Sequence, residues 1–268
     1  MHPSLNLNAL LDHVLRSAQS VAEYQRAARA DFSADQIEYK QRNDLVSFVD
    51  RESERRLVAD LRKVLPGAGF ILEEGDNEGE DREWRWIIDP LDGTTNFLHD
   101  IPAWCISIAL QKAEETVLGV VHDVAHGRVY RAIKGQGAHV VGQRERLRVS
   151  ASAQLEDALI GTGFPYAVND SPNDYLSVLG ELLKKSRGIR RLGAAALDLA
   201  WVAAGKLDAF YEMELQPWDV AAGALLVEEA GGAISDFGGT ANFVFGRQIV
   251  ASNRKLHGQL LGVLGNRF

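Results

Sequence analysis

The sequence has one cysteine, two methionines and no long apolar run. The single Cys105 excludes an internal disulfide, and its place in the apolar segment AWCISIAL predicts a small core residue rather than a nucleophile. No segment approaches the roughly 20 consecutive apolar residues that a membrane-spanning helix needs. The first residues do not show the basic and then apolar pattern of a secretory signal, which favours a cytoplasmic location without a membrane span.

Positive charge is also scarce, because 29 Lys and Arg residues face 37 Asp and Glu residues, which gives a net charge of −8. Surfaces that bind nucleic acid need clustered Lys and Arg side chains to meet the phosphate backbone. We therefore expect no direct binding to nucleic acid. The excess of acid either serves solubility or gathers carboxylates around cations, and composition leaves both open.

The order of the predicted elements indicates an α/β architecture in one structural unit of 268 residues. An N-terminal half, about residues 1–150, begins with an amphipathic helix to about Arg29 and a second helix from Arg51 to the Pro66-Gly67 stop. Strand-like runs and turns follow, as in a meandering sheet. A C-terminal half, about residues 151–268, alternates strands and helices. Helices of both halves are expected to cover sheets in layers.

The segment WRWIIDPLDGTTNF, residues 84–97, places two carboxylates at the end of an apolar strand. Pro90 cannot continue a strand ladder, so we expect Asp92 to turn back toward the side of Asp89. Aspartates in such a turn also commonly bond their own backbone, which is the structural alternative. Gly93 and Thr94 mark a helix start whose free N–H groups suit a phosphate. Carboxylates beside an anion require cations between them, and Mg²⁺ fits both.

Three further acidic residues lie at element ends. Glu73 follows the strand GFIL, Asp219 opens the apolar helix VAAGALLVEEAGG, and Asp50 precedes RESERRL. Each has an ordinary structural explanation, since Glu73 begins an acidic loop and aspartates are frequent helix N-caps. The joint pattern predicts a shared acidic site.

These segments resemble a known family. WIIDPLDGTTNF resembles the signature W-x-x-D-P-x-D-G-T-x-N-F of the inositol monophosphatase family, and PWDVAAGALLVEEAGG resembles its second signature. The resemblance extends to NDLVSFVD, ILEE and GAAALDLAWVAAGKLDAFYE, and so covers essentially the whole chain. It implies the layered αβαβα sandwich of the inositol monophosphatase and fructose-1,6-bisphosphatase type, a homodimer, and Mg²⁺-dependent, lithium-sensitive hydrolysis of a phosphate monoester.

The resemblance also implies residue roles by position. The implied metal ligands are Glu73, Asp89, the backbone carbonyl of Leu91, Asp92 and Asp219. The implied catalytic residues are Asp50 and Thr94, which activate the attacking water, and Glu73, on which a third ion would depend. The implied substrate contacts are Gly93 and Thr94 for phosphate, and Asp92, Ala195, Glu212 and Asp219 for the alcohol.

The resemblance favours myo-inositol 1-phosphate as the substrate, with histidinol phosphate, fructose 1,6-bisphosphate or a nucleotide 3′-phosphate as alternatives. Two positions on the alcohol side depart from the family pattern. Ala194 stands where relatives often have Ser or Thr, and Glu214 stands where many have Gly.

Two other functions have a basis in the sequence. His122 and His126 are spaced for a zinc pair on a helix, but the segments around them predict strands and a turn. A regulatory protein that contacts transcription machinery is the alternative of another class, and its candidate surface is Arg187, Arg190 and Arg191.

Overall fold

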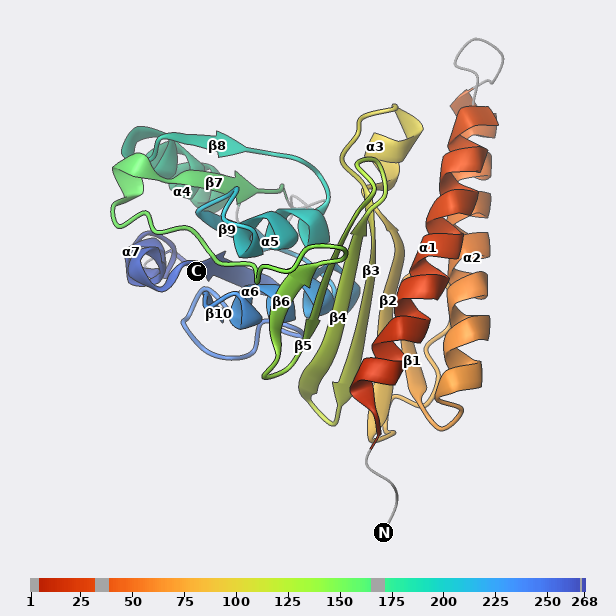
Figure 1. The fold of residues 1–268 in the computed structure, drawn as a ribbon. Coiled ribbons are helices and arrows are strands. Elements are labelled where there is room, and N and C mark those ends of the chain that lie inside the picture. The colour runs from red at the N-terminus through yellow and green to blue at the C-terminus, as the bar shows by residue number, and fades with distance from the viewer. Residues whose placement is uncertain (1–4, 32–38, 165–171, 266) are drawn as a thin grey trace.

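Two β-sheets and three layers of helices make up the molecule (Figure 1). The computed structural model describes residues 5–31, 39–164, 172–265 and 267–268. Along the layers, a helix pair covers the first sheet, a second pair lies between the two sheets, and a third pair covers the second sheet. This arrangement confirms the predicted αβαβα layering.

The first sheet has six strands in sequence order, and only its first pair is parallel. The strands are β1 (Gly69–Leu72), β2 (Trp84–Asp92), β3 (Cys105–Lys112), β4 (Glu115–Asp123), β5 (Arg128–Ile133) and β6 (Gly137–Val140). Helix layers cover both faces of its central strands, which explains why β3 is a continuous apolar run. Cys105 begins this strand and is buried, as predicted.

The second sheet has five strands in the order β10-β11-β9-β7-β8. Its strands are β7 (Leu159–Thr162), β8 (Gly188–Arg190), β9 (Ala209–Met213), β10 (Ala233–Ser235) and β11 (Gln248–Ser252), and the short 3₁₀ turn η1 (Leu155–Asp157) precedes β7. Strand β9 is central, parallel to β7 and antiparallel to β11. The ends of β9 and β11 therefore meet at one edge of the functional cavity described below.

Seven helices appear in the described part of the chain. They are α1 (Leu7–Asp31), α2 (Tyr39–Val64), α3 (Thr94–Leu98), α4 (Pro172–Lys185), α5 (Ala195–Ala203), α6 (Pro217–Glu229) and α7 (Arg254–Leu264). Helices α1 and α2 pack on the first sheet, α5 and α6 fill the space between the sheets, and α4 and α7 pack on the second sheet. Because α6 contacts both sheets, its residues from Val220 to Val227 are all buried.

Four elements differ from the sequence-based expectations. Helix α2 begins at Tyr39 rather than at Arg51, so Asp50 lies inside a helix and is not its N-cap. In α6, Gln216 is the N-cap, and Asp219 is the third residue of the helix and closes a capping box. Strand β8 and helix α7 were not predicted.

A buried glutamine of α1 holds the end of β2. The Nε2 atom of Gln25 donates to the carbonyl of Pro90 over 2.7 Å and to Ser53 Oγ over 3.1 Å. Strand β2 continues to Asp92, but its register against β3 shifts between Asp89 and Asp92, where Pro90 interrupts the ladder. The bulge turns both aspartates toward the same cavity, as the sequence predicted.

The two spaced histidines do not form a pair. His122 lies on β4 and is 1% exposed beneath α1, whereas His126 follows in a turn with its Nδ1 atom 2.9 Å from Asp123 Oδ1. The predicted strand and turn are therefore confirmed. Among the described residues, every helix falls short of the length or apolarity that crossing a membrane requires.

The burial of His122 should make the stability of the protein depend on pH. Burial lowers the pKa of His122 to about 4 from 6.5, and the charge of Arg26 adds to this effect. A lowered pKa in the folded state means that His122 contributes stability above pH 6.5 that is lost as the pH falls toward 4.

The unfolding free energy of the wild type should fall when the pH is lowered from neutral to about 4.5. We expect this fall to be smaller in His122→Gln by roughly 2–3 kcal/mol. The glutamine amide can still bond the backbone of Ala18 but cannot be protonated in this range. Urea unfolding of both proteins at the two pH values measures this difference. If the wild type and the variant lose the same unfolding free energy on acidification, His122 is not buried in its neutral form.

Candidate active site

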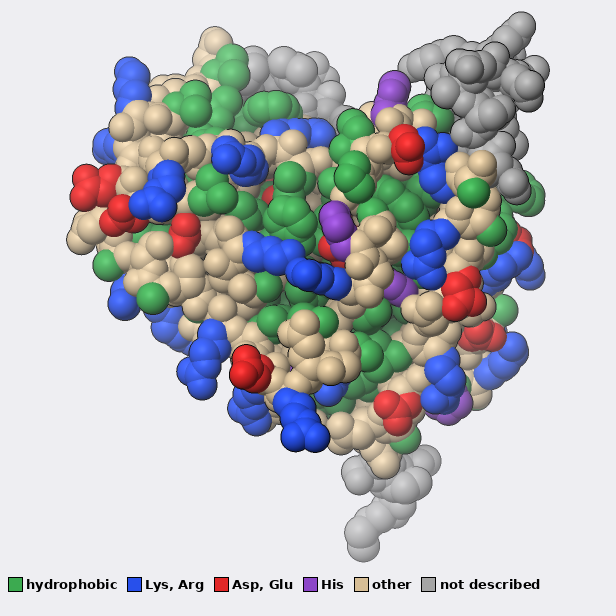
Figure 2. Space-filling view, turned by 45° about the horizontal axis from the view of Figure 1, so that its top comes forward, with side chains coloured by type: hydrophobic (Ala, Val, Ile, Leu, Met, Phe, Trp, Pro, Cys, Tyr) green, Lys and Arg blue, Asp and Glu red, His purple; other side chains and the backbone are tan. Residues whose placement is uncertain are grey.

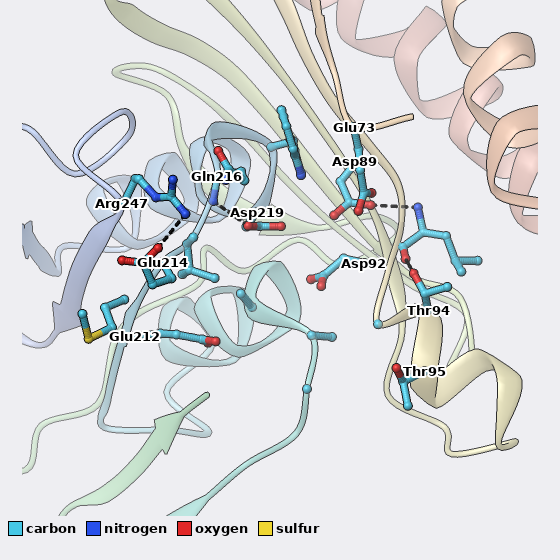
Figure 3. Close-up of a pocket in the computed structure, with 18 of the residues that line it drawn as sticks. Glu73, Asp89, Asp92, Thr94, Thr95, Glu212, Glu214, Gln216, Asp219 and Arg247 are labelled. Carbon is cyan, nitrogen blue, oxygen red and sulfur yellow. Dashed lines mark hydrogen bonds and ion pairs between the residues drawn. The ribbon is translucent and has the colours of Figure 1, made fainter. Parts of the chain in front are cut away.

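A cavity of about 580 Å³ opens where the two sheets and α3, α5 and α6 approach one another (Figure 3). Its lining takes residues from both halves of the chain, from Glu73 after β1 to Arg247 before β11. One side is acidic and lies at the end of β2. The other side lies at the end of β9 and carries Glu212, Glu214 and two arginines.

Three aspartates meet on the acidic side. Oxygen atoms of Asp89, Asp92 and Asp219 all lie within 4.8 Å of one another. Glu73 lies beside Asp89 in the same cavity (Figure 3). The structure therefore brings together four of the five acidic side chains that the sequence assigned to one site, although they come from separate segments of the chain.

Backbone N–H groups orient the three aspartates. The N–H of Leu91 donates to Asp89 Oδ1 over 2.9 Å, and the N–H of Gln216 donates to Asp219 Oδ2 over 2.7 Å. Asp92 Oδ2 accepts from the N–H of Ala196 over 2.8 Å, in the first turn of α5. Each aspartate thus has one oxygen fixed by the backbone and a second oxygen available to a ligand.

The electrostatics of this side favour a cation. Burial raises the pKa of Asp92 to about 6 and those of Asp219 and Glu73 to about 7, and it raises the pKa of Asp89 well above its usual range. Buried carboxylates that lie so close cannot all ionise without a compensating positive charge. The buried Oε2 atom of Glu73 also lacks a hydrogen-bond partner. This donor set could hold a metal ion.

Asp50 and Thr94 form a second polar group beside the acids. Thr94 Oγ1 lies 3.1 Å from the carbonyl of Leu91 and 3.4 Å from Asp50 Oδ2, and it can donate its one proton to either. Asp50 is 2% exposed, and its Oδ1 atom has no partner. Burial raises the pKa of Asp50 to about 9, with a further contribution from the charge of Glu73.

Gly93 connects β2 to α3 in a conformation that suits glycine. Its φ angle is +94°, and a Cβ atom at this position would lie 2.8 Å from the carbonyl oxygen of Ala103. Helix α3 begins at the next residue, Thr94, so its first backbone N–H groups have no partners within the helix. Gly93 and Thr94 therefore line the cavity where the sequence predicted a phosphate seat.

Glu212 and Ala195 line the other side of the cavity. Glu212 lies on β9, and burial raises its pKa to about 8, with further contributions from Asp219 and Asp92. Its carboxylate lies against Gly163, where an added Cβ atom would lie 1.8 Å from Glu212 Oε1. The site residues implied by the family resemblance thus line a single cavity, except for Asp50, which is buried beside Thr94.

Several residues at the site were not predicted to be there. Arg191 lines the cavity, whereas Arg187 pairs with Asp157 over 3.1 Å and Arg190 lies on β8. All three arginines are exposed, and the contact surface that they were expected to form stays a prediction. Asn96 Nδ2 donates to the carbonyls of Ala103 and Leu192 over 2.6 and 2.8 Å and fixes the segment before α5.

Asp198 is a further buried acid that sequence reasoning did not select. It lies on α5, is 1% exposed, and its Oδ1 atom has no partner. Burial raises its pKa well above the usual range, with a further contribution from Glu212. Its position inside an apolar helical segment was the available signal, because an unpaired acid at a core position is unusual.

Comparison with known proteins gives the same assignment as this geometry. Residues 8–266 match the Inositol monophosphatase family. This chain belongs to that family. It is 44% identical over 268 residues to "Nus factor SuhB" of Pseudomonas aeruginosa, with 97% of this chain and 95% of the relative covered. It is 42% identical over 258 residues to "Inositol-1-monophosphatase" of Mesorhizobium japonicum, with 95% of each covered.

A solved structure supports the same relationship. The inositol monophosphatase from Anabaena (Nostoc) sp. PCC 7120 superposes with a TM-score of 0.87 at 33% sequence identity, and 98% of each chain is covered. The fold is that of the inositol monophosphatases, as the sequence predicted. Membership of this family supports a phosphatase activity, and the acidic cluster of the cavity is consistent with the family's dependence on metal.

Gly163 provides a test of the side of the cavity that holds Glu212. In Gly163→Ala the new methyl group takes the place of the Glu212 carboxylate, which can move because it is the end of a flexible side chain. We expect KM for a phosphate monoester to rise about tenfold, equivalent to ~1.4 kcal/mol, with a smaller change in kcat.

Steady-state kinetics of the purified variant measures both constants. Gly180→Ala is the matched control, because an added Cβ atom at Gly180 of α4 has no atom within 4 Å. An unchanged KM in Gly163→Ala would show that Glu212 does not contribute to substrate binding.

Proposed function

We propose that this protein hydrolyses a small phosphate monoester in a Mg²⁺-dependent reaction, and that its preferred substrate is myo-inositol 1-phosphate. The observation that carries the proposal is the cavity in which Asp89, Asp92 and Asp219 bring oxygen atoms within 4.8 Å. Family membership adds the reaction class. Because the cavity is lined from both halves, we also propose that residues 1–268 work as one unit.

The donors fit Mg²⁺ better than softer metals. The proposed ligands are the carboxylates of Glu73, Asp89, Asp92 and Asp219 and the carbonyl of Leu91. All are hard oxygen donors, which Mg²⁺ prefers over nitrogen and sulfur donors. The Leu91 carbonyl accepts from Thr94 through one lone pair and keeps a second one free. When bound, the metal would offset the phosphate charge and make a water molecule more acidic.

Side chains and backbone groups of the protein would orient the attacking water and bind the phosphate. Thr94 Oγ1 orients the attacking water. Asp50 Oδ2, 3.4 Å from Thr94 Oγ1, would accept the released proton once the positive charge of a bound metal had lowered the pKa of Asp50 from about 9. The N–H groups of Gly93 and Thr94 bind the phosphate oxygens at the start of α3. Such placement supplies much of the catalysis in phosphoryl transfer, because the chemistry needs charge stabilisation and an in-line water rather than covalent help.

Polar groups around the rest of the cavity suit a polyol. The carboxylates of Glu212, Asp92 and Asp219 can accept hydrogen bonds from alcohol hydroxyls, and the backbone of Ala195 provides another contact. A relative named "Inositol-1-monophosphatase" favours inositol among the candidates. Histidinol phosphate, fructose 1,6-bisphosphate and a nucleotide 3′-phosphate are the alternatives within the same chemistry. The homodimer, lithium inhibition and cytoplasmic location stay predictions.

Phosphate release tests the proposal. We expect the purified protein to hydrolyse myo-inositol 1-phosphate with added Mg²⁺ and to lose this activity when the metal is chelated. Asp89→Asn should reduce kcat by at least about a hundredfold, because it removes a charged oxygen donor at the centre of the acidic group. A panel of the alternative phosphate esters, compared by kcat/KM, ranks the substrates.

A folding control accompanies this experiment. Mg²⁺ should raise the Tm of the wild type, since a ligand that binds only the folded state stabilises it, and should raise that of Asp89→Asn much less. Without metal, Asp89→Asn should be at least as stable as the wild type, because it removes a buried carboxyl that lies among other acids. Metal-independent hydrolysis, or near-normal turnover by Asp89→Asn, would reject the proposed site.

A regulatory role is the second candidate, and it rests on the relative named "Nus factor SuhB". On the face shown in Figure 2, Lys and Arg side chains lie in small groups among other types. Arg190 is exposed on β8 and bonds only its own segment, through the Ile189 carbonyl. We propose it as the contact to transcription machinery because it lies outside the cavity lining.

Arg190→Glu tests this role. We expect the variant to lose binding to purified RNA polymerase complexes in a pull-down assay, while phosphate release stays unchanged. Arg144→Glu, an exposed arginine in the loop after β6, is the charge-matched control. Equal binding by the wild type and both variants would exclude Arg190 as a contact, and no binding by any of them would exclude the role.

A further inference from the structure

An ion pair closes the end of the cavity away from the aspartates. Arg247 Nη2 lies 2.6 Å from Glu214 Oε2, and both residues line the cavity (Figure 3). Strands β9 and β11 pair up to Met213 and Gln248, so Glu214 and Arg247 are the first residues beyond that ladder. The N–H of Leu215 donates to the Arg247 carbonyl over 3.3 Å and keeps the two segments together.

The backbone at this pair is unusual. Glu214 and Arg247 have φ angles of +66° and +63°, in the left-handed region that non-glycine residues rarely adopt. Only two other non-glycine residues in the described part of the chain share this feature, Asp100 and Ala113. Such a conformation is unfavourable for a residue with a side chain, because Cβ comes close to the following carbonyl oxygen. Backbone strain of this kind gathers at functional sites, where it fixes the direction of a side chain.

Glu214 and Arg247 form a neutral ion pair at this end of the cavity. Glu212 and Arg191 also line this end, whereas the aspartates and Glu73, where the proposed metal binds, line the other. A substrate whose alcohol part is uncharged leaves the ion pair intact.

We propose that the Glu214–Arg247 ion pair is a specificity determinant that rejects substrates with a second phosphate and so restricts the site to monophosphates of uncharged alcohols. This inference rests on the proposed function, since it concerns the alcohol side of the same cavity. Without Glu214, Arg247 would be a suitable phosphate ligand, because its planar guanidinium binds phosphate oxygens in pairs. Glu214 already occupies that guanidinium.

Repulsion by Glu214 matters more than the strength of the ion pair. The side chains of Arg247 and Glu214 are 51% and 35% exposed, so water screens the pair and its attraction is weak. A second phosphate could therefore displace the carboxylate from Arg247. It would then lie beside the displaced carboxylate, and like charges at that distance oppose binding.

Two substrates that differ only in the second phosphate test the inference. We compare kcat/KM for myo-inositol 1-phosphate and myo-inositol 1,4-bisphosphate, with Mg²⁺ present. In Glu214→Gln, which keeps the size of the side chain but not its charge, we expect the ratio of bisphosphate to monophosphate activity to rise about tenfold over the wild type. The double variant Glu214→Gln/Arg247→Gln should lose this gain, because the freed guanidinium is its source.

The outcomes are distinguishable from failure of the proposed function. An unchanged ratio in Glu214→Gln, or a gain that persists in the double variant, overturns the inference. If no variant hydrolyses either compound, the proposed function fails, and equilibrium binding of myo-inositol 1,4-bisphosphate decides about the ion pair. A lower Kd in Glu214→Gln than in the wild type and the double variant then supports the inference, and equal Kd values overturn it.

Discussion

The constraint on which this structure depends is the confinement of several carboxylates in one cavity without a basic side chain among them. Asp89, Asp92 and Asp219 are close enough that each raises the free energy of ionising the others. Ordinary folding would favour a structure that separates them. They stay together because backbone N–H groups hold one oxygen of each, and those donors belong to segments that the core fixes in place.

The same contacts join the two halves of the chain. Asp92 lies at the end of β2, but its partner Ala196 lies in the first turn of α5, where the helix dipole also favours a negative charge. Asn96 of α3 bonds the carbonyl of Leu192 before that helix. The residues that prepare the acidic site therefore also set the distance between the sheets. These few hydrogen bonds thus belong both to the acidic site and to the contact between the two halves of the chain.

The acidic residues on the second side of the cavity are accommodated in a different way. Glu212 has space for its carboxylate because Gly163 has no side chain, and Glu214 is neutralised by Arg247. The acidic side thus concentrates carboxyl groups, whereas the other side has an ion pair and a space left by Gly163. Under the proposed function, the reaction takes place at the first side and the alcohol is recognised at the second.

The sequence by itself determined most of the strands, the layered fold class and the candidate acids, because apolar runs between turn residues and acids at element ends are local patterns. Strand β8 was missed because its three residues, Gly188–Arg190, are too short for such a run. Helix α7 also had a local signal that was not used, with Asn253 as its N-cap and Leu256 and Leu260 one turn apart. The start of α2 lacked such a signal, since its segment YKQRND is polar, and this misassigned Asp50 to a helix end. Only the tertiary structure decided which charges meet. Arg191 and Arg247 join the cavity, and Arg187 does not, because distances between residues far apart in sequence depend on the packing of whole layers.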